Sequence, residues 1–271
     1  MRLPAVRRVI GLSLVSAAVV GCSNLPPASS SYSLQRFAVP EVASKSYQVD
    51  VHIGTAEMHK VSLPSTQNGK PTFDCIELFD CHENDATFVQ AGVSIVPGLA
   101  FSYDNQLDRV GVIWQFAGAH LGDSKTGNFS QALVFGASGH SDLAWANQYE
   151  SNLGIDTLVR TDSWNQHTKA YDIGWVGGYR LNDDWLIYGG PFYTLHKIDL
   201  ESRSEIYNVT PNVTVVGFYD FEGKQLGANI AAQYRFFDVM ELNIEVVSAR
   251  YKLNSGSQTD TQLNLMLGAR F

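Results

Sequence analysis

Cysteine, basic charge and long apolar runs are all scarce in this sequence. It has 3 cysteines in 271 residues, and only His82 lies near the pair at 75 and 81, so neither a metal site nor a cofactor is predicted. Lysine and arginine number 19 against 27 acidic residues, a net charge of −8, which argues against nucleic acid as a partner. Beyond residue 22 no apolar run approaches the roughly 20 residues of a transmembrane helix.

Glycine and aromatic residues are plentiful, and from Lys45 onward apolar and polar residues alternate. The chain holds 23 glycines, 12 tyrosines and 14 phenylalanines, which suits an all-β protein. The alternating segments match the roughly 9 to 11 residues of a tilted membrane strand better than the roughly five or six of a soluble sandwich. An antiparallel, up-and-down transmembrane β-barrel is therefore predicted over residues 45–271.

The alternation predicts ten strands, an even number that places both ends of the barrel on the periplasmic side. It blurs around residues 136–141, so eight strands, with 128–160 as one long hairpin or loop, is the alternative. The ten predicted strands lie near 45–59, 87–103, 109–121, 128–137, 143–160, 168–181, 185–199, 222–235, 240–252 and 259–271.

Short turns are predicted at 104–108, 182–184 and 237–239, all at one rim. Aromatic residues such as Tyr103 and Trp185 flank them, as expected of a girdle at one membrane interface.

Longer connections are predicted on the extracellular side, at 61–86 and 201–221. Exposed loops carry much of the specificity of barrels, so these two are the predicted contacts for an extracellular ligand. Trp164 and His167, in a third predicted loop, are expected to add to a binding surface.

The amino end resembles the signal peptide of bacterial lipoproteins. Arg2, Arg7 and Arg8 precede an apolar stretch too short to span a bilayer, and small residues lead to Cys22. The resemblance implies removal of residues 1–21 by the lipoprotein processing machinery, acylation of Cys22 with palmitate-type chains, and an outer-membrane address. An ordinary secretory signal is the alternative.

Residues 22–44 are rich in proline and serine. Such a composition predicts a lipidated, flexible tether outside the fold. With Cys22 acylated, Cys75 and Cys81 remain, and in the oxidising compartment of an exported protein they are predicted to form a disulfide.

The carboxyl end also resembles a known family of proteins. Phe271, with apolar residues at every second position before it, resembles the signal that the barrel assembly machinery recognises. The whole pattern resembles small outer-membrane barrels of the OmpA and OmpX kind, with a lipoprotein leader added. The resemblance implies a Gram-negative outer-membrane protein surrounded by outer-membrane lipids and anchored at its amino end.

Charged residues on the inward face of the last strands predict a polar plug. Arg235, Glu241, Glu245 and Arg270 are expected to pair across neighbouring strands, because a barrel of eight to ten strands is nearly filled by its side chains. Asp172 and Arg180 are expected to join such a network. This interpretation favours a structural role for the interior over a narrow channel for small solutes.

Two residue groups raise the alternative of an outer-membrane enzyme. Asp50 and His52 have the residue types that omptin-like proteases use, but no Asp-x-Asp partner is present, so an interior pair is predicted. His140-Ser141-Asp142 has the types of a lipid A deacylase-like barrel. These three are consecutive in a glycine-rich segment predicted as a periplasmic turn, where alternation would separate neighbours. The sequence therefore predicts a structural or surface-interaction protein without catalysis.

Overall fold

The computed structural model describes residues 29–63, 85–105, 107–151, 157–207, 213–236, 239–254 and 256–271. Cys22, Cys75 and Cys81 lie outside these ranges, so the predicted acylation and disulfide stay predictions. The described residues contain no helix that is long and apolar enough to cross a membrane. The chain divides into two compact units: residues 143–164 with 202–217, called the four-strand unit, and 27–142, 165–201 and 218–271, called the barrel unit.

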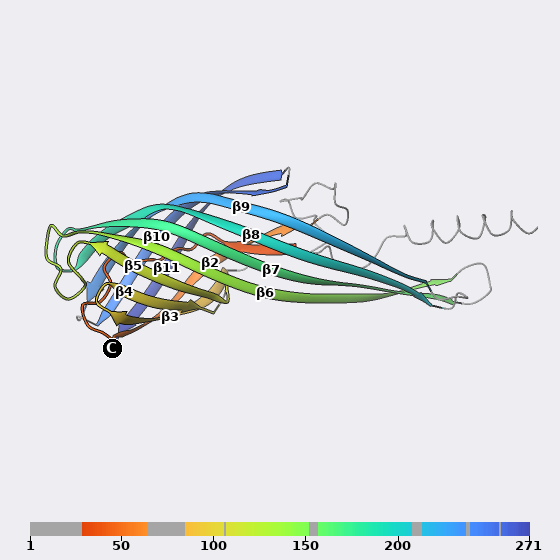
Figure 1. Ribbon diagram of the computed structural model, residues 1–271, viewed down its shortest axis with the longest axis horizontal. Helices are drawn as coiled ribbons and strands as arrows, with labels where there is room; N and C mark the ends of the chain where they lie inside the picture. The colour runs from red at the N-terminus through yellow and green to blue at the C-terminus, as the bar shows by residue number, and fades with distance from the viewer. Residues whose placement is uncertain are drawn as a thin grey trace, which may run out of the picture. The chain divides into compact units, whose positions relative to one another are not determined.

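The fold is all-β, and every pairing recorded for the strands β1–β6 and β9–β11 is antiparallel (Figure 1). The strands are β1 (Ser29–Ser33), β2 (Val49–Ser62), β3 (Asp85–Val96), β4 (Leu99–Asp104), β5 (Arg109–Ala117), β6 (Phe129–Ser151), β7 (Thr157–Arg180), β8 (Trp185–Tyr207), β9 (Val213–Phe236), β10 (Met240–Leu253) and β11 (Gly256–Arg270).

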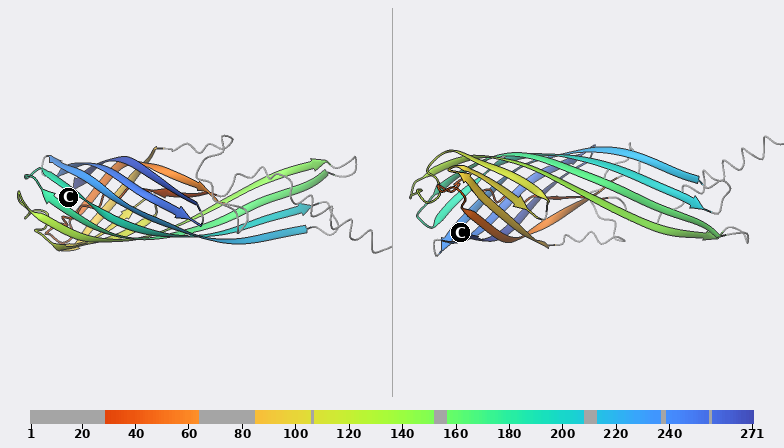
Figure 2. Two further views of the ribbon diagram at one scale, coloured as in Figure 1. Left: turned by 90° about the horizontal axis from the view of Figure 1, so that it is seen from above. Right: turned by 60° about the horizontal axis from the view of Figure 1, so that its bottom comes forward.

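Ten of these strands form a closed ring. The sheet runs in sequence order from β3 to β11, and β2 closes it by pairing with both β11 and β3 (Figure 2). The β2–β11 seam covers Asp50–Thr55 against Leu265–Arg270 only, and farther along β2 its residues 58–62 pair with β1 instead. Backbone bonds between Val49 and Phe271 bring the two ends of the ring together.

The predicted number of strands is right, although two errors offset each other. Residues 87–103 are two strands, because Pro97 and Gly98 form a tight turn with Gly98 at φ +81°. The strand predicted at 128–137 and the one predicted to begin at 143 are a single strand, β6, which ends at Ser151, because the glycines and small residues at 136–141 stay in the sheet. The last residues of the predicted 143–160 belong to β7, which begins at Thr157.

The two ends of the ring differ. We call the end with Phe271 and the turns at 97–98 and 181–184 the C-terminal rim, and the other end, with the β4–β5 and β10–β11 connections, the opposite rim. The connection predicted at 104–108 is present between β4 and β5, but its placement beside 182–184 was wrong, because the turn inside 87–103 reverses the chain once more. Tyr103 is therefore at the opposite rim.

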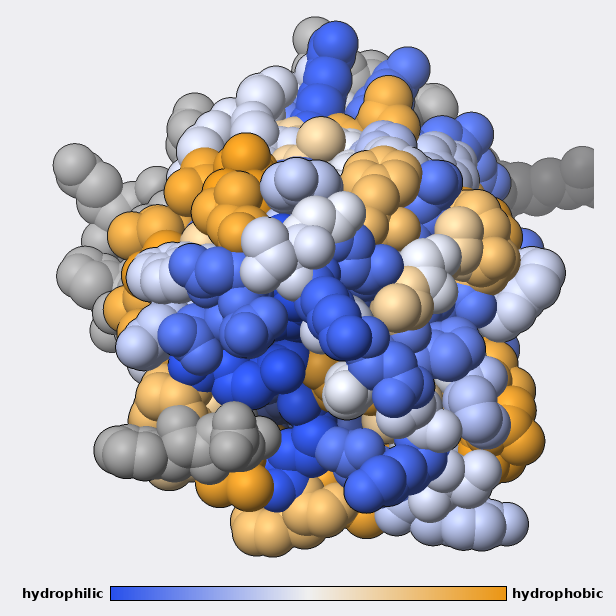
Figure 3. All heavy atoms as spheres, turned by 90° about the vertical axis from the view of Figure 1, so that its left-hand side faces the viewer, coloured by the Kyte–Doolittle hydropathy of each residue, from blue (hydrophilic) through white to orange (hydrophobic). Residues whose placement is uncertain are grey.

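Side chains of the barrel unit alternate between an apolar outer face and a polar interior. On β10, Ile244 and Val246 are exposed, whereas Glu241, Asn243 and Glu245 are almost completely buried. Seen toward the C-terminal rim, hydrophilic residues gather near the centre of the face and hydrophobic ones toward its edge (Figure 3). Other exposed apolar residues on the strands of the ring are Val51, Ile53, Phe101, Val110, Trp114, Ile187, Leu226, Ile230, Leu263, Leu265 and Leu267.

Residues 29–44, called the lumen segment, run through the interior of the ring. The segment begins as β1, which pairs with residues 58–62 of β2. It then runs to the C-terminal rim, where the Ser44 amide donates to Leu121 O. Leu34, Phe37 and Val42 are buried. The prediction of a flexible tether was wrong for this part of 22–44, because its apolar and charged side chains find partners inside the barrel.

Apolar contacts hold the lumen segment on two sides. Ala38 packs in a cluster with Val134, Val176, Leu186, Tyr188 and Ala231. Phe37 packs with Ala56, Phe88 and Met266, its ring stacked on Phe88 at 5.7 Å between centroids. Burying several apolar side chains in this way is worth about 1.5–3 kcal/mol for each large one, enough to offset part of the ordering cost of the segment.

The four-strand unit is formed by parts of the long strands β6 to β9, which have 23 or 24 residues each. The loop predicted at 201–221 is strand up to Tyr207 and again from Val213, while 208–212 lies outside the described residues. Trp164 and His167 lie within β7 and not in a loop. In this unit Val215 and Val216 are both exposed, and since neighbours on a strand point to opposite faces, both faces are exposed there.

Candidate functional site

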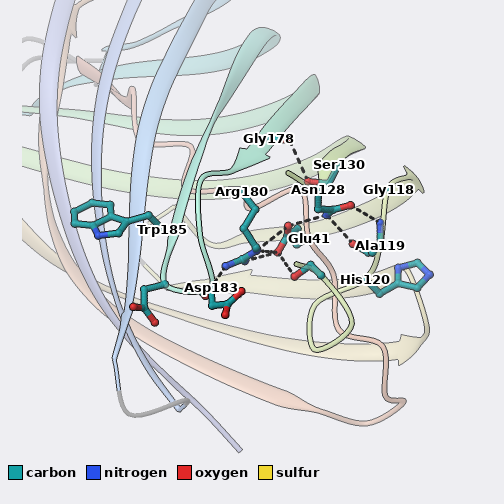
Figure 4. A network of polar contacts seen from close by, with 12 residues as sticks. Glu41, Gly118, Ala119, His120, Asn128, Ser130, Gly178, Arg180, Asp183 and Trp185 are labelled. Carbon is teal, nitrogen blue, oxygen red and sulfur yellow. Dashed lines mark hydrogen bonds and ion pairs between the residues drawn. The ribbon is translucent and has the colours of Figure 1, made fainter. Parts of the chain in front are cut away.

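The most deeply buried ion pair joins the lumen segment to the ring near the C-terminal rim (Figure 4). Arg180, at the end of β7, donates from Nε to both carboxylate oxygens of Glu41, at 3.2 and 3.1 Å, and from Nη2 to Oε2. The two side chains are 1% and 0% exposed. A buried charge is tolerated when it is paired and hydrogen-bonded.

The carboxylate of Glu41 has two further donors in the β5–β6 connection. Asn128 Nδ2 and Ser124 Oγ each donate to it at 2.9 Å, and Arg180 also donates from Nη1 to the Asp183 carbonyl at 3.0 Å. Glu41 therefore ties the lumen segment to two connections of the C-terminal rim. Arg180 was predicted from the sequence to join an interior network, whereas its partner Glu41 was not predicted.

A second cluster surrounds Glu241 at the same rim. Arg270 Nη2 donates to Glu241 at 2.9 Å, and His52 Nε2 lies 2.9 Å from the other carboxylate oxygen. His52 Nδ1 is 3.5 Å from Asp50. Arg235 lies opposite Glu241 in the β9–β10 register and is half-buried. Asp50 and His52 are thus part of an interior network at the C-terminal rim.

Glu245 does not pair with an arginine of the ring. Its carboxylate accepts the backbone amides of Arg36 and Phe37, at 3.0 and 3.1 Å. Asn229 and Asn264 also donate to it, at 2.6 and 3.0 Å. Glu245 thus anchors the middle of the lumen segment through its backbone, a role that residue types alone do not reveal.

A cavity of about 220 Å³ lies on the side of Glu245 that faces the opposite rim. Asp172 on its wall accepts two bonds from Arg109, at 2.8 and 2.7 Å, so these two charges offset each other. The cavity is smaller than common ligand pockets of about 300–1,000 Å³ and suits a small polar molecule. The residues around it include Arg36, Ser138, Gln166, Thr168, Thr194, His196 and Gln225.

The guanidinium of Arg36 forms part of this cavity and lies 3.9 Å above the ring of Phe192. It donates to Gln35 O at 2.9 Å, Thr194 Oγ1 at 3.1 Å and Gln225 Oε1 at 3.2 Å. Its Nε is buried without a hydrogen-bond partner. All its acceptors are neutral, which distinguishes it from Arg109 and Arg180.

The His140-Ser141-Asp142 group lies in β6, at the opposite rim, and not in a periplasmic turn. His140 Nε2 lies 2.9 Å from Asp142 Oδ1, and both residues border the cavity. Ser141 is exposed and its Oγ lies 2.8 Å from Nδ1 of the exposed His167 on β7. No carboxylate within the described ranges contacts His167, so the serine and histidine lack the third group that would orient the base.

The clusters around Glu41 and Glu241 do not resemble a metal centre. In the part of the chain that the structure describes, no three histidine, cysteine, aspartate or glutamate side chains are close enough together to hold a metal ion.

Two charged residues of the interior, Arg36 and Glu41, were not predicted from the sequence. Both are charges in a proline- and serine-rich segment, and its apolar residues Leu34, Phe37 and Val42 do not by themselves indicate a place inside the ring.

Comparisons with known proteins add a resemblance in fold. No family model and no curated protein matches the chain. Among solved structures, the attachment invasion locus protein Ail of Yersinia pestis shares 10% identity at a TM-score of 0.33, covering 84% of this chain and 100% of its own. The outer membrane protease OmpT of Escherichia coli shares 10% at 0.35, covering 92% and 98%. The outer membrane channel DcaP of Acinetobacter baumannii shares 8% at 0.22, covering 90% and 97%. Since these TM-scores are low, the description of the fold as a closed ten-stranded barrel rests on its own strand pairing.

Proposed function

We propose that this protein is an outer-membrane β-barrel, closed by its own lumen segment, that acts by contacting partners outside the cell and not by catalysis or conduction. The observation that carries the proposal is the course of residues 29–44 through the ring, where Glu41 of the segment is bonded to Arg180 of β7 and the amides of Arg36 and Phe37 are bonded to Glu245 of β10. A lumen occupied by chain and by salt-bridged side chains leaves little room for a solute path.

The outer face supports a membrane location. Apolar side chains such as Ile53, Ile230 and Leu265 are exposed on it, and hydrocarbon is the solvent that favours such a surface. Aromatic residues also meet at the C-terminal rim, where the rings of Trp185 and Tyr234 are 4.9 Å apart, as in the girdles of membrane barrels.

The long strands support a role outside the membrane. β8 has 23 residues, more than twice the roughly 9 to 11 that a tilted membrane strand needs. Strands of this length continue beyond the membrane, and a sheet with apolar residues exposed on both faces, as at Val215 and Val216, is suited to contact with another molecule. We include in the proposal the acylation of Cys22 and the Cys75–Cys81 disulfide.

Surface labelling of intact cells tests the proposal. In a variant with Cys75 and Cys81 replaced by serine, Val215→Cys is expected to react with a membrane-impermeant maleimide on whole cells. Val239→Cys, exposed in the β9–β10 turn at the C-terminal rim, is the matched control and is expected to react only after permeabilisation. Unheated protein from the same cells should migrate differently from boiled protein in SDS gels.

Two results would contradict the proposal. Labelling of Val239→Cys but not Val215→Cys on whole cells would reverse the orientation and remove the surface role. Discrete current steps from the full-length protein in planar bilayers would show a channel, the alternative function considered from the sequence.

A further inference from the structure

We infer that the cavity near the opposite rim is a binding site for a small anionic group, a carboxylate or a phosphate, with Arg36 as its cation. A cation buried without an anionic partner is costly. Arg109 meets Asp172, and Arg180 meets Glu41. Arg36 lines the cavity, and its guanidinium has no carboxylate within 4.0 Å among the residues described.

Polar side chains accompany Arg36 around the cavity. Arg36 Nε has no hydrogen-bond partner, and the side chains of His196 and Gln225, which interact with each other, line the same cavity. An N–H that is buried without an acceptor costs stability, and one oxygen-rich group would satisfy several donors together. Asp172 and Glu245 act on Arg36 electrostatically, but Asp172 is bonded to Arg109 and Glu245 to backbone amides and asparagines, and Asp142 is bonded to His140, so none of these carboxylates accepts a bond from the guanidinium.

Nitrogen-15 spectra of arginine-labelled protein in detergent micelles test the site. The Arg36 Nε–H resonance, identified by its loss in Arg36→Lys, is expected to shift saturably with inorganic phosphate or acetate. Arg250, which is exposed and donates to Ser257 Oγ, is the control, and its resonance should not show a saturable shift. Thr194→Glu, which supplies an internal carboxylate beside the guanidinium, should weaken phosphate binding by about tenfold or more, whereas the neutral Thr194→Gln should bind nearly as wild type.

The outcomes distinguish a lipid headgroup from a free anion as the ligand. Binding of dihexanoyl phosphatidate more tightly than phosphate, with the same loss in Thr194→Glu, would identify a lipid headgroup, and equal binding a free anion. The absence of a saturable Arg36 shift with any of these probes, or equal binding by Thr194→Glu and Thr194→Gln, would overturn the inference.

A second inference comes from the direction of the lumen segment and rests on the proposed orientation of the barrel. We propose that the amino-terminal lipid anchor lies in the outer leaflet of the outer membrane. Ser29 pairs with Ser62 and Ser33 with Met58, so the segment begins at the opposite rim. It ends at the C-terminal rim, where Ala43 bridges Leu121. The chain therefore enters the ring from the side opposite Phe271.

The distance between Cys22 and Ser29 limits where an acyl chain can insert. Seven residue steps reach at most about 25 Å when fully extended, less than the hydrocarbon core of about 30 Å. The anchor therefore cannot return across the membrane to the leaflet next to the C-terminal rim. Acyl chains on Cys22 would be buried in the lipid surface at the opposite rim, where each methylene contributes about 0.8 kcal/mol.

Labelling near Cys22 tests the position of the anchor. In the variant lacking Cys75 and Cys81, Asn24→Cys should react with impermeant maleimide on intact cells, as Val215→Cys does, while Val239→Cys does not. Reaction of Val215→Cys without reaction of Asn24→Cys before permeabilisation would overturn this inference and leave the proposed function standing. The tryptic peptide from residues 22 to 36 should carry the mass of its acyl chains, and an unmodified Cys22 would overturn the anchor itself.

Discussion

Deletion of residues 29–44 is expected to convert a closed barrel into a conducting pore. The segment contributes Leu34, Phe37 and Val42 to the interior and covers polar side chains of the ring. Without it, the carboxylate of Glu245 and the guanidinium of Arg180 would face water, and hydrated charges would line a continuous path. Discrete current steps are expected in planar bilayers from the deletion variant but not from the full-length protein.

Two further measurements test whether the lumen segment closes the barrel. The change of gel mobility on boiling shows whether the deletion variant has closed its ring. Phe37→Asp retains the full chain length and places a carboxylate against Ala56, Phe88 and Met266, close to the carboxylate of Glu245, so it should also conduct. A deletion variant that shows the mobility change yet carries no current would mean that the lumen segment is not what closes the barrel.

Arg180→Met is expected to destabilise the barrel strongly. The substitution leaves the completely buried carboxylate of Glu41 with two neutral donors and no cation, and removing one partner of a buried pair costs about 3–5 kcal/mol. The free energy of unfolding, followed by tryptophan fluorescence during urea titration in lipid vesicles, should fall by this amount. Trypsin should also cleave after Arg36 once the segment loosens.

The double variant Arg180→Met/Glu41→Met isolates the cause. It removes both charges, and well-packed apolar replacements of buried pairs are often close to neutral, so it should recover most of the lost stability. Arg203→Met breaks an exposed ion pair with Glu205 and should leave the unfolding curve unchanged. If the double variant were as unstable as Arg180→Met, the loss would come from packing of the arginine side chain and not from its charge.

Alternation carried most of the information about the ring. An apolar outer face and a polar interior leave a period of two in the sequence, so the last two strands were predicted to within a few residues. The end of β9 was predicted equally well, but the strand begins at Val213 and not at 222. Local errors arose where turn chemistry and alternation disagreed. Pro97-Gly98 made a turn inside an apolar stretch, and the glycines at 136 and 139 remained in β6 although their composition indicated a break.

The lumen segment could not be predicted from its own composition. Proline and serine indicate a flexible chain, and the partners of Glu41 and Arg36 are far away in sequence, on β7, β8 and β9. Burial of such a segment depends on the shape and charge of an interior that exists only after the ring has formed. The inward charges of the ring were predicted, yet Glu245 was assigned a partner on a neighbouring strand, whereas it bonds to backbone amides of the segment.

The short seam between β2 and β11 has a consequence for the order of assembly. A chain that runs inside a closed ring must either be threaded through it or be enclosed as the ring closes. The lumen segment leads directly into β2, and β1 is already paired with the free outer part of that strand. β2, the first strand of the ring, can therefore bring the segment into place while the barrel is still an open sheet. Pairing of the last six residues of β11 with β2 then closes the ring around the segment.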